Sequence, residues 1–206
     1  MKIVVIANEV LKGELLAQQA VDNVVVEWQD EITPVQGTDA YIDLLFNHSS
    51  ERIDKLKSFQ PATIIVNAVT ATFNELPAGF IRINGWNSFL KRNLVEAAGT
   101  DGNKKAAEKI FSCFNKLTEW VPDIPGFITP RVISMIINEA YFTLDEKVST
   151  KKEIDTAMKL GTNYPYGPFE WGATIGLKNV YELLTMMSKT NSRYTPSSLL
   201  QKEASA

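Results

Sequence analysis

Residues 153–177 read EIDTAMKLGTNYPYGPFEWGATIGL, and this stretch decides the fold of the second half of the chain. Apolar residues recur at helical spacing in its first part, and the run stops at Gly161. The segment YPYGP follows, and its two prolines fix the backbone before any tertiary contact forms. A second apolar run begins at Phe169. The stretch therefore predicts a helix, a rigid turn and a second apolar segment.

Helical spacing extends to both sides of this stretch. The pattern predicts helices over residues 131–146, 150–160, 179–188 and 196–202. Ser149 or Thr150 is the predicted N-cap of the helix at 150–160, and Glu153 completes a capping box. The segment VPDIPG at 121–126 is rich in proline and glycine. We therefore expect a domain boundary there, between residues 1–122 and residues 123–206.

The first half alternates between strand-like and helix-like patterns. Apolar, often β-branched runs predict strands at residues 2–7, 23–28, 39–46, 63–69, 80–83 and 93–97. Helical spacing predicts helices at residues 11–20, 49–59 and 103–120, the second with Ser49 or Ser50 as its N-cap. Strands that alternate with short helices are typical of a mostly parallel sheet. The expected fold class is α/β for the first domain and all-α for the second.

Composition excludes several classes of protein. The 206 residues are 45% hydrophobic and 22% charged, with a net charge of −3, as in an ordinary globular protein. The absence of a basic block argues against a nucleic-acid partner. No apolar run is long enough to span a membrane, and the N-terminus does not resemble a signal peptide, so we expect a cytoplasmic protein. One cysteine, Cys113, and one histidine, His48, leave no recognisable metal site.

Four segments of the second half match one family. They are DIPGFI at 123–128, INEA at 137–140, YPYGPFE at 164–170 and YTPSSLL at 194–200. Together they resemble the C-terminal domain of 3-hydroxyacyl-CoA dehydrogenases. The resemblance implies a Rossmann-like NAD-binding domain followed by a helical domain of the 6-phosphogluconate-dehydrogenase-like type. It also implies NAD as cofactor, an acyl-CoA substrate in the cleft between the domains, and a homodimer formed through the C-terminal domain.

The first strand runs into a segment that departs from the phosphate-binding loop of this family. The family reads G-x-G-x-x-G there, because glycines allow a tight turn and close approach of the backbone to pyrophosphate. Ala7, Glu9 and Lys12 occupy the three glycine positions. Glu9 would put a carboxylate where the pyrophosphate lies. Glu9 is also favourable in the first turn of a helix, where a negative charge interacts with the helix dipole. Lys12 is typical of a solvated helix face. We therefore assign no cofactor site.

The N-terminal domain is also shorter than the resemblance implies. The helical excursion between the second and third strands is missing, and residues 31–38 bridge the gap as a loop. The acidic residue expected after the second strand, which would bind ribose hydroxyls, falls at Trp28. Glu27 and Asp30 are its acidic neighbours. We expect a shortened Rossmann-like domain.

The catalytic segment of the family resembles HFFNPxPxxxLVE, in which the histidine is the general base and the glutamate orients it. The spacing is preserved here from Asn84 to Glu96, and Asn87 also matches. Asparagine does not titrate near neutral pH, so Asn84 cannot act as this base. A second polar position of the family falls at Pro130, which has no polar side chain.

Three further residues are candidates for substrate binding. Asn67 follows a predicted strand, where an amide can hydrogen-bond a carbonyl. Trp86 adjoins Asn87 and suits either the site or the core. His48 follows the third predicted strand, at the sheet edge where α/β proteins place ligands, and is the imidazole available as a replacement base. A histidine beside a helix cap is an equally good interpretation.

Three functions are compatible with these features, the third being a purely structural helical dimerisation module. The first is a degenerate 3-hydroxyacyl-CoA dehydrogenase homologue that lacks NAD-dependent catalysis and keeps acyl-CoA binding or dimerisation. The second is a functional NAD-dependent oxidoreductase of fatty-acid metabolism with His48 or water as base. Three departures, at Glu9, Asn84 and Pro130, favour the first.

Overall fold

The computed structural model describes residues 1–19 and 24–206. The chain forms two compact units, Met1–Phe127 and Ile128–Ala206, here called unit 1 and unit 2. The last residue of the helix predicted at 11–20 and the first residue of the strand predicted at 23–28 lie outside the described residues. Among the described residues, no helix is long and apolar enough to cross a membrane.

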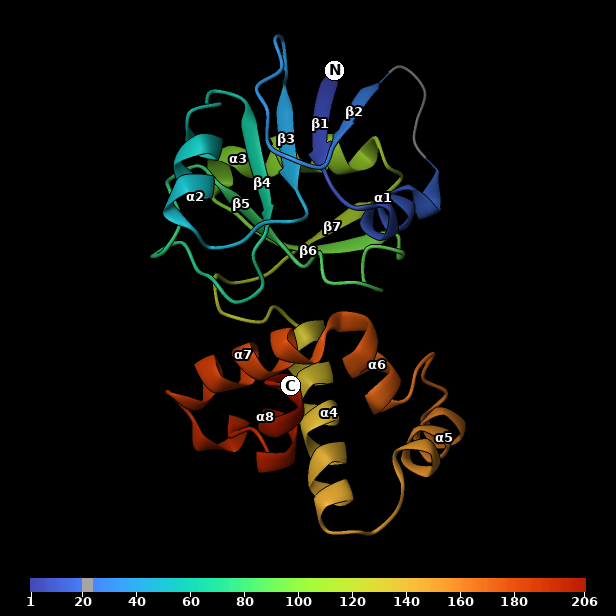
Figure 1. Cartoon of the computed structure of the whole chain (residues 1–206). Helices are drawn as coiled ribbons and strands as arrows, with labels where there is room; N and C mark the ends of the chain where they lie inside the picture. Colours follow the sequence, from blue (N-terminus) through green and yellow to red (C-terminus); the bar gives the residue numbers. More distant parts are fainter. Residues whose placement is uncertain (20–23) are drawn as a thin grey trace. The chain divides into compact units, whose positions relative to one another are not determined.

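A seven-stranded sheet forms the centre of unit 1 in the described part of the chain (Figure 1). Its strands, in chain order, are β1 (Lys2–Ile6), β2 (Val25–Gln29), β3 (Ala40–Asp43), β4 (Thr63–Asn67), β5 (Ile81–Ile83), β6 (Leu94–Ala98) and β7 (Leu117–Trp120). The spatial order is β2-β1-β3-β4-β5-β6-β7. Every neighbouring pair is parallel except β5 and β6, so the mostly parallel sheet is confirmed.

Three helices and one short 3₁₀ helix accompany the sheet: α1 (Glu9–Leu15), η1 (Leu16–Gln18), α2 (Ser50–Lys57) and α3 (Asp101–Ser112). Leu11 and Leu15 of α1 join Phe111 of α3 in the apolar core on one face. Leu56 of α2 belongs to the core on the other face. Ser49 caps α2, as predicted, since its hydroxyl accepts a hydrogen bond from the N–H of Arg52. The sheet is therefore covered on both faces, as parallel sheets require.

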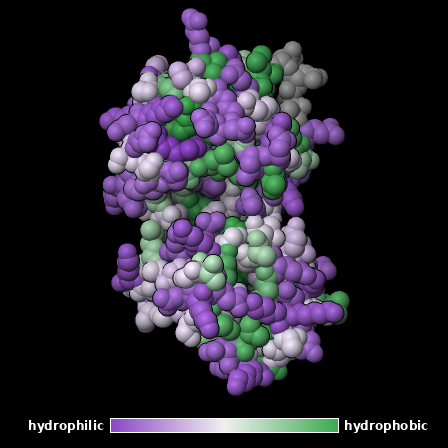
Figure 2. All heavy atoms as spheres, in the orientation of Figure 1, coloured by the Kyte–Doolittle hydropathy of each residue, from purple (hydrophilic) through white to green (hydrophobic). Residues whose placement is uncertain are grey.

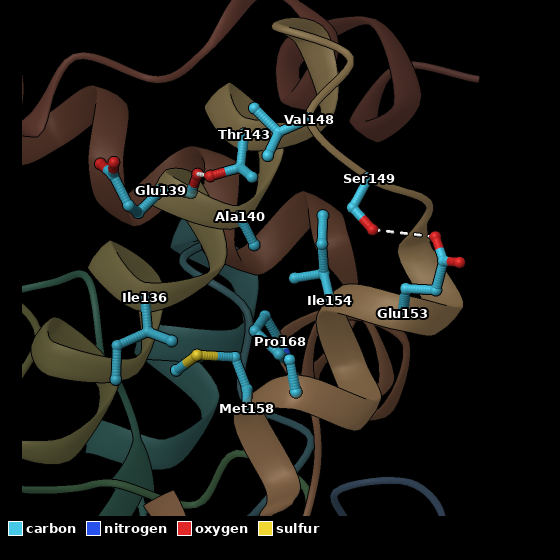
Figure 3. A pocket seen from close by; sticks show the side chains of 11 residues that line it. Ile136, Glu139, Ala140, Thr143, Val148, Ser149, Glu153, Ile154, Met158 and Pro168 are labelled. Atoms are coloured by element: carbon cyan, nitrogen blue, oxygen red, sulfur yellow. Dashed lines mark hydrogen bonds between the residues drawn. The ribbon is translucent and has the colours of Figure 1, made fainter. Parts of the chain in front are cut away.

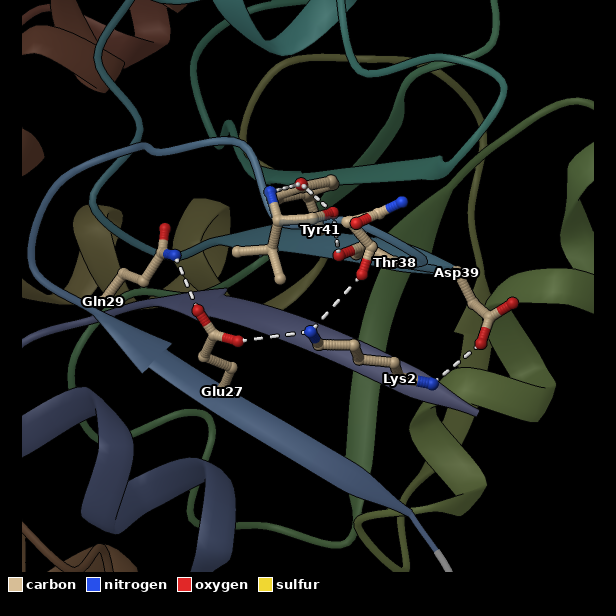
Figure 4. Close-up of polar contacts among 8 residues, drawn as sticks. Lys2, Glu27, Gln29, Thr38, Asp39 and Tyr41 are labelled. Carbon is tan, nitrogen blue, oxygen red and sulfur yellow. Dashed lines mark hydrogen bonds and ion pairs between the residues drawn. The ribbon is translucent and has the colours of Figure 1, made fainter.

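The connection from β2 to β3 explains why unit 1 is short. Residues 30–39 contain no helix or strand, which confirms the predicted loop. The first strand holds this loop in place: the Lys2 backbone N–H donates to Asp39 at 2.7 Å (Figure 4), and Lys2 Nζ donates to the carbonyl of Gln36 at 3.4 Å. The hydroxyl of Tyr41 accepts a hydrogen bond from the N–H of Val35 at 2.9 Å. The usual Rossmann order has another strand beyond β2, whereas here the sheet ends at β2.

The helix predicted over residues 103–120 is wrong in its last part. Helix α3 ends at Ser112, and Asn115 adopts a left-handed conformation with φ of 51°. The chain then enters β7, whose residues pair with β6 from Leu117 onward. Helical spacing of the apolar residues up to Phe114 concealed this change, because a four-residue edge strand carries little pattern of its own.

Unit 2 is helical. It contains α4 (Thr129–Asp145), α5 (Lys151–Thr162), α6 (Pro168–Ile175), α7 (Leu177–Ser188), η2 (Ser192–Tyr194) and α8 (Ser198–Ala204). The predicted capping box of α5 is confirmed, with Thr150 and Glu153 satisfying each other's backbone N–H groups. The second apolar run after the turn is the separate helix α6, which begins with Pro168 at its first position.

The turn in the stretch 153–177 is fixed by one buried carboxylate. Asp155 of α5 is 8% exposed and accepts a hydrogen bond from the N–H of Phe169 at 2.8 Å. A Cβ atom at Gly167 would overlap with the side chain of Asp155. The φ of −74° at Gly167 suits any residue. The close approach of the Asp155 side chain, and not the backbone conformation, therefore requires glycine at this position. The contact joins the end of the turn to the middle of α5.

The segment DIPGF belongs to unit 1 by its contacts. Asp123 forms an ion pair with the fully buried Arg82 and accepts a hydrogen bond from the N–H of Phe73. The Gly126 N–H donates to the carbonyl of Val69 at 2.8 Å, and the Arg82 guanidinium lies 5.0 Å from the ring centre of Phe127. These contacts place the division of the chain after Phe127 rather than after residue 122.

Candidate functional site

Asn84 and Glu96 form a buried pair at one end of β5. Asn84 follows β5 directly, and Glu96 lies in the adjacent strand β6. The Asn84 Nδ2 atom donates to Glu96 Oε2 at 3.2 Å, and the Asn84 backbone N–H donates to the Glu96 carbonyl at 3.0 Å. The two side chains are 2% and 5% exposed. The structure thus brings together two residues that the sequence places twelve positions apart.

The loop after Asn84 carries two further candidates. The Trp86 N–H donates to Asn84 Oδ1 at 3.3 Å, so both ends of the Asn84 amide are engaged. Trp86 is 7% exposed, which favours the packing interpretation. Asn87 is half-buried on the same loop. The arrangement holds the Asn84 amide against Glu96.

Asn67 has a structural role. Its Nδ2 atom donates to the carbonyl of Leu44 at 3.1 Å, and its Oδ1 atom accepts from the Gly85 N–H at 2.9 Å. A Cβ at Gly85 would lie 2.8 Å from the Asn67 Cγ atom. The amide therefore ties together the loops that follow β3 and β5, on either side of β4, instead of presenting its oxygen to a ligand.

A charged cluster that the sequence did not reveal supports the same loop. Glu14 of α1 is 4% exposed and accepts a hydrogen bond from the Ser88 N–H at 2.7 Å. Ser88 has a φ of 78°, in the left-handed region. Lys116, 2% exposed, donates to the carbonyls of Leu90 and Arg92. The available signal was the position of Glu14, three residues after Leu11 on the apolar face of α1.

Burial controls the charges in this cluster. It raises the pKa of Glu14, although the Ser88 N–H and the nearby cations Lys91 and Lys116 oppose the shift. Burial also lowers the pKa of Lys116 to about 8, and Glu14 partly offsets this shift. One Glu14 oxygen, Oε2, has no hydrogen-bond partner among the described residues. The cluster is therefore costly to bury, and it fixes α1 against the loop at 86–92.

The start of α1 does not fit a pyrophosphate. Asn8 caps the helix, with its Oδ1 atom accepting from the Leu11 N–H at 2.9 Å. Ala7 is buried, and its N–H donates to the carbonyl of Gln29. The exposed Glu9 lies in the first turn, 3.4 Å from Lys12 Nζ, which also lies 5.5 Å from the Trp28 ring centre. Side chains stand at all three family glycine positions, so these residues do not fit the glycine turn that holds the pyrophosphate of NAD.

The end of β2 adjoins a polar pocket. Glu27 accepts a hydrogen bond from Gln29 and pairs with Lys2, so it serves the sheet surface (Figure 4). Asp30 lines a pocket of about 290 Å³ together with Glu31 and the first turns of α2. Arg52 also lines it, but its guanidinium is held by Asp43 through two hydrogen bonds of 2.7 Å. Burial raises the pKa of Asp43 despite this ion pair.

His48 and Pro130 lie in other surroundings. His48 is exposed, and its Nε2 atom lies 3.0 Å from the carbonyl oxygen of Glu75, so it is joined to the loop before β5. Pro130 is buried at the start of α4 in unit 2. Within the described residues, no group of histidine, cysteine and acidic side chains could hold a metal ion.

Unit 2 contains an apolar pocket of about 380 Å³ between α4 and α5 (Figure 3). Its apolar walls are Ile136, Ala140, Val148, Ile154, Ala157, Met158 and Pro168. Glu139, Thr143, Ser149 and Glu153 complete the lining, with the Ser149 hydroxyl donating to Glu153 at 2.9 Å. No sequence pattern indicates this pocket, because its residues come from two helices that each look like ordinary amphipathic helices, from the connection between them and from the first residue of α6.

Comparison with known proteins identifies the helical unit. Residues 126–206 match the family model of the 3-hydroxyacyl-CoA dehydrogenase C-terminal domain. A 3-hydroxyadipyl-CoA dehydrogenase of Escherichia coli K12 is 44% identical over 41% of this chain and 18% of its own length. A 3-hydroxybutyryl-CoA dehydrogenase of Bradyrhizobium diazoefficiens is 33% identical over 66% of this chain and 48% of its own length. The chain thus spans about half, or less, of these two curated relatives.

Comparison with solved structures supports the fold of both units. The crystal structure of an (S)-3-hydroxybutyryl-CoA dehydrogenase from Ralstonia eutropha aligns with a TM-score of 0.76 and 19% identity. The alignment covers 99% of this chain and 93% of that one. The Rossmann-like sheet and the helical unit are therefore a fold shared with this dehydrogenase, and residues 126–206 match the family of 3-hydroxyacyl-CoA dehydrogenase C-terminal domains.

Proposed function

We propose that this chain is a degenerate 3-hydroxyacyl-CoA dehydrogenase homologue that binds a CoA thioester and does not catalyse NAD-dependent hydride transfer. The observation that carries the proposal is the buried Asn84–Glu96 pair, with its 3.2 Å hydrogen bond. The resemblance gives the Asn84 position to the general base. An amide in that position can orient a polar group, but it cannot take a proton at neutral pH.

Two features of unit 1 support the loss of the cofactor. The α1 N-terminus is capped by Asn8 and carries Glu9, so its positive end already has an acceptor and an anion. The usual dinucleotide fold uses a strand and a helix beyond β2, and this sheet ends at β2. Without a hydride acceptor, dehydrogenation cannot proceed, whatever residue takes the proton.

The ligand class comes from the relatives. The two curated relatives are named for 3-hydroxyadipyl-CoA and 3-hydroxybutyryl-CoA, both of which are CoA thioesters. The part of this chain that matches the family model is the helical unit. We infer that a CoA thioester is the ligand that this chain retained.

The helical unit also supports a homodimer. The pocket between α4 and α5 is open and largely apolar, and exposed apolar side chains lie in and after these helices. Val148 is 67% exposed and Leu160 is 83% exposed. Figure 2 shows hydrophobic residues among hydrophilic ones on the visible face of unit 2. Such exposed apolar groups mark an interface in many proteins. Light scattering after size exclusion should give twice the chain mass, and Leu160→Asp should reduce it.

Thermal unfolding tests the proposed function. The protein is unfolded alone, with millimolar acetoacetyl-CoA, and with millimolar NADH. A ligand at a hundred times its dissociation constant stabilises by about 2.7 kcal/mol, which raises the melting temperature visibly. We expect a shift with the thioester and none with NADH. A shift with NADH would instead support a functional oxidoreductase with an unconventional base such as His48. No shift with either ligand would leave dimerisation as the function of the chain.

A further inference from the structure

The outer edge of β2 presents unpaired backbone groups. The Val25 N–H donates to the carbonyl of Met1, and the carbonyl of Gln29 accepts from the N–H of Ala7, both at 3.0 Å. In a parallel pair the backbone groups of alternate residues point to the same side. The N–H and C=O groups of Val26 and Trp28 therefore point away from β1, and among the described residues no strand lies there.

Within the described residues, this edge carries no proline, no bulge and no lysine, and no strand pairs with it. Proteins protect edge strands with proline, bulges, lysine or a covering element. The strand reads VVEWQ, pairs with β1 over five consecutive residues, and has no bulge. Its one charged residue, Glu27, lies 3.5 Å from Lys2 Nζ. The connection over residues 30–39 leads directly to β3, on the other side of β1, and leaves the position beside β2 without an intrachain strand.

The side chains around the edge define the partner's chemistry. Val26 and Trp28 pack partly into the apolar core on one face. The side chain of Glu27 lies on the opposite face and is 41% exposed. Asp30 and Glu31, both exposed, follow at the end of the strand. A strand with apolar residues on one face and basic residues on the other would complement both faces.

A second copy of this chain fits the edge less well. Antiparallel pairing that sets Val26 of one copy opposite Trp28 of the other would place the two copies of Glu27 directly opposite each other. Like charges in opposite positions of a strand pair are destabilising. The acidic end of β2 thus favours a basic foreign segment over self-pairing.

We propose that β2 is a docking edge at which an extended segment of a partner protein, with alternating apolar and basic residues, adds a strand to the sheet. Backbone hydrogen bonds to Val26 and Trp28 supply affinity in this mode, and Glu27 with Asp30 supplies specificity. The proposal is independent of CoA binding, because it uses a different part of unit 1.

Amide hydrogen exchange measured by NMR tests the docking edge on the full chain. The probe is a short acetylated peptide of alternating valine and lysine, and the control peptide has glutamate for lysine. With the lysine peptide, exchange at the N–H groups of Val26 and Trp28 should slow about tenfold or more, which corresponds to about 1.4 kcal/mol of protection. The glutamate peptide should leave both rates unchanged. Equal protection by both peptides, or by neither, would overturn the proposal.

Two matched variants place a proline on opposite edges of the sheet. Val26→Pro removes an outward N–H of β2, and Thr118→Pro removes one of β7. Only Val26→Pro should abolish protection of Trp28 by the lysine peptide. Glu27→Gln keeps the strand intact. It should reduce the difference between the protection from exchange given by the lysine peptide and that given by the glutamate peptide. Protection of Val26 that rises with protein concentration alone would show a second copy on this edge and contradict the proposal.

Discussion

Gly167→Ala is the substitution whose cost follows most directly from the geometry. The new Cβ would overlap with the Asp155 side chain, which must then move. Overpacking of this kind costs about 1–3 kcal/mol. If Asp155 moves away, the Phe169 N–H loses its 2.8 Å hydrogen bond, at a further cost of about 1–3 kcal/mol for a buried donor. We expect a loss of about 2–6 kcal/mol in the unfolding free energy of unit 2.

Gly161→Ala is the matched control. Gly161 lies in α5, and a Cβ there would meet nothing within 4 Å. Alanine is favoured over glycine within helices by about 0.5–1 kcal/mol, so this variant should be more stable than the original. Urea unfolding of fluorotryptophan-labelled protein measures the stability of both variants. Trp171 lies in α6, so its signal follows the unfolding of unit 2. Equal stability of the two variants would refute the role given to the Asp155–Gly167 contact.

Three further substitutions test the charged groups of unit 1. The pKa of Lys116 is lowered from 10.5 to about 8. Between these values the unfolded chain binds a proton that the folded one does not, so this residue makes stability rise with pH. Lys116→Met should remove that rise, as measured by urea midpoints from about pH 7.5 to 9.5. Asp123→Ala leaves the buried Arg82 without its ion-pair partner and should cost up to about 4 kcal/mol in urea unfolding; a cost within about 0.5 kcal/mol would contradict the role of this pair. Asn84→His should place an imidazole beside Glu96, yet give no NADH oxidation with acetoacetyl-CoA, because the α1 N-terminus is unchanged; measurable turnover would show that the cofactor site survives.

Local signals predicted the parts of the fold that depend on local chemistry. Ser49 and the Thr150–Glu153 capping box lie where the sequence places them, because a cap is decided within four residues. The loop at 31–38 was predicted because the helical excursion of the family between the second and third strands has no counterpart in this sequence. Strand β7 was missed because its identity depends on pairing with β6, and no local pattern encodes that pairing.

The candidate site shows the same division. The resemblance pairs Asn84 with Glu96, and the structure contains this contact, since neighbouring strands hold the two residues in register. Asn67 was a candidate for substrate binding, and its amide makes hydrogen bonds to backbone groups of two loops. Glu14 was missed because its partners come from residues far along the chain. Sequence patterns report which residues are present, whereas non-local hydrogen bonds decide which of them remain available.

The most direct test of the central claim is a titration of the protein with NADH, followed by the nicotinamide fluorescence. Binding to a Rossmann domain would change this emission, and the capped α1 N-terminus with Glu9 predicts no saturable change up to millimolar NADH. The same sample, titrated with acetoacetyl-CoA by calorimetry, should release or absorb heat and so show that the protein is folded and competent to bind. Saturable NADH binding at micromolar concentrations would contradict the loss of the cofactor site and with it the proposed function.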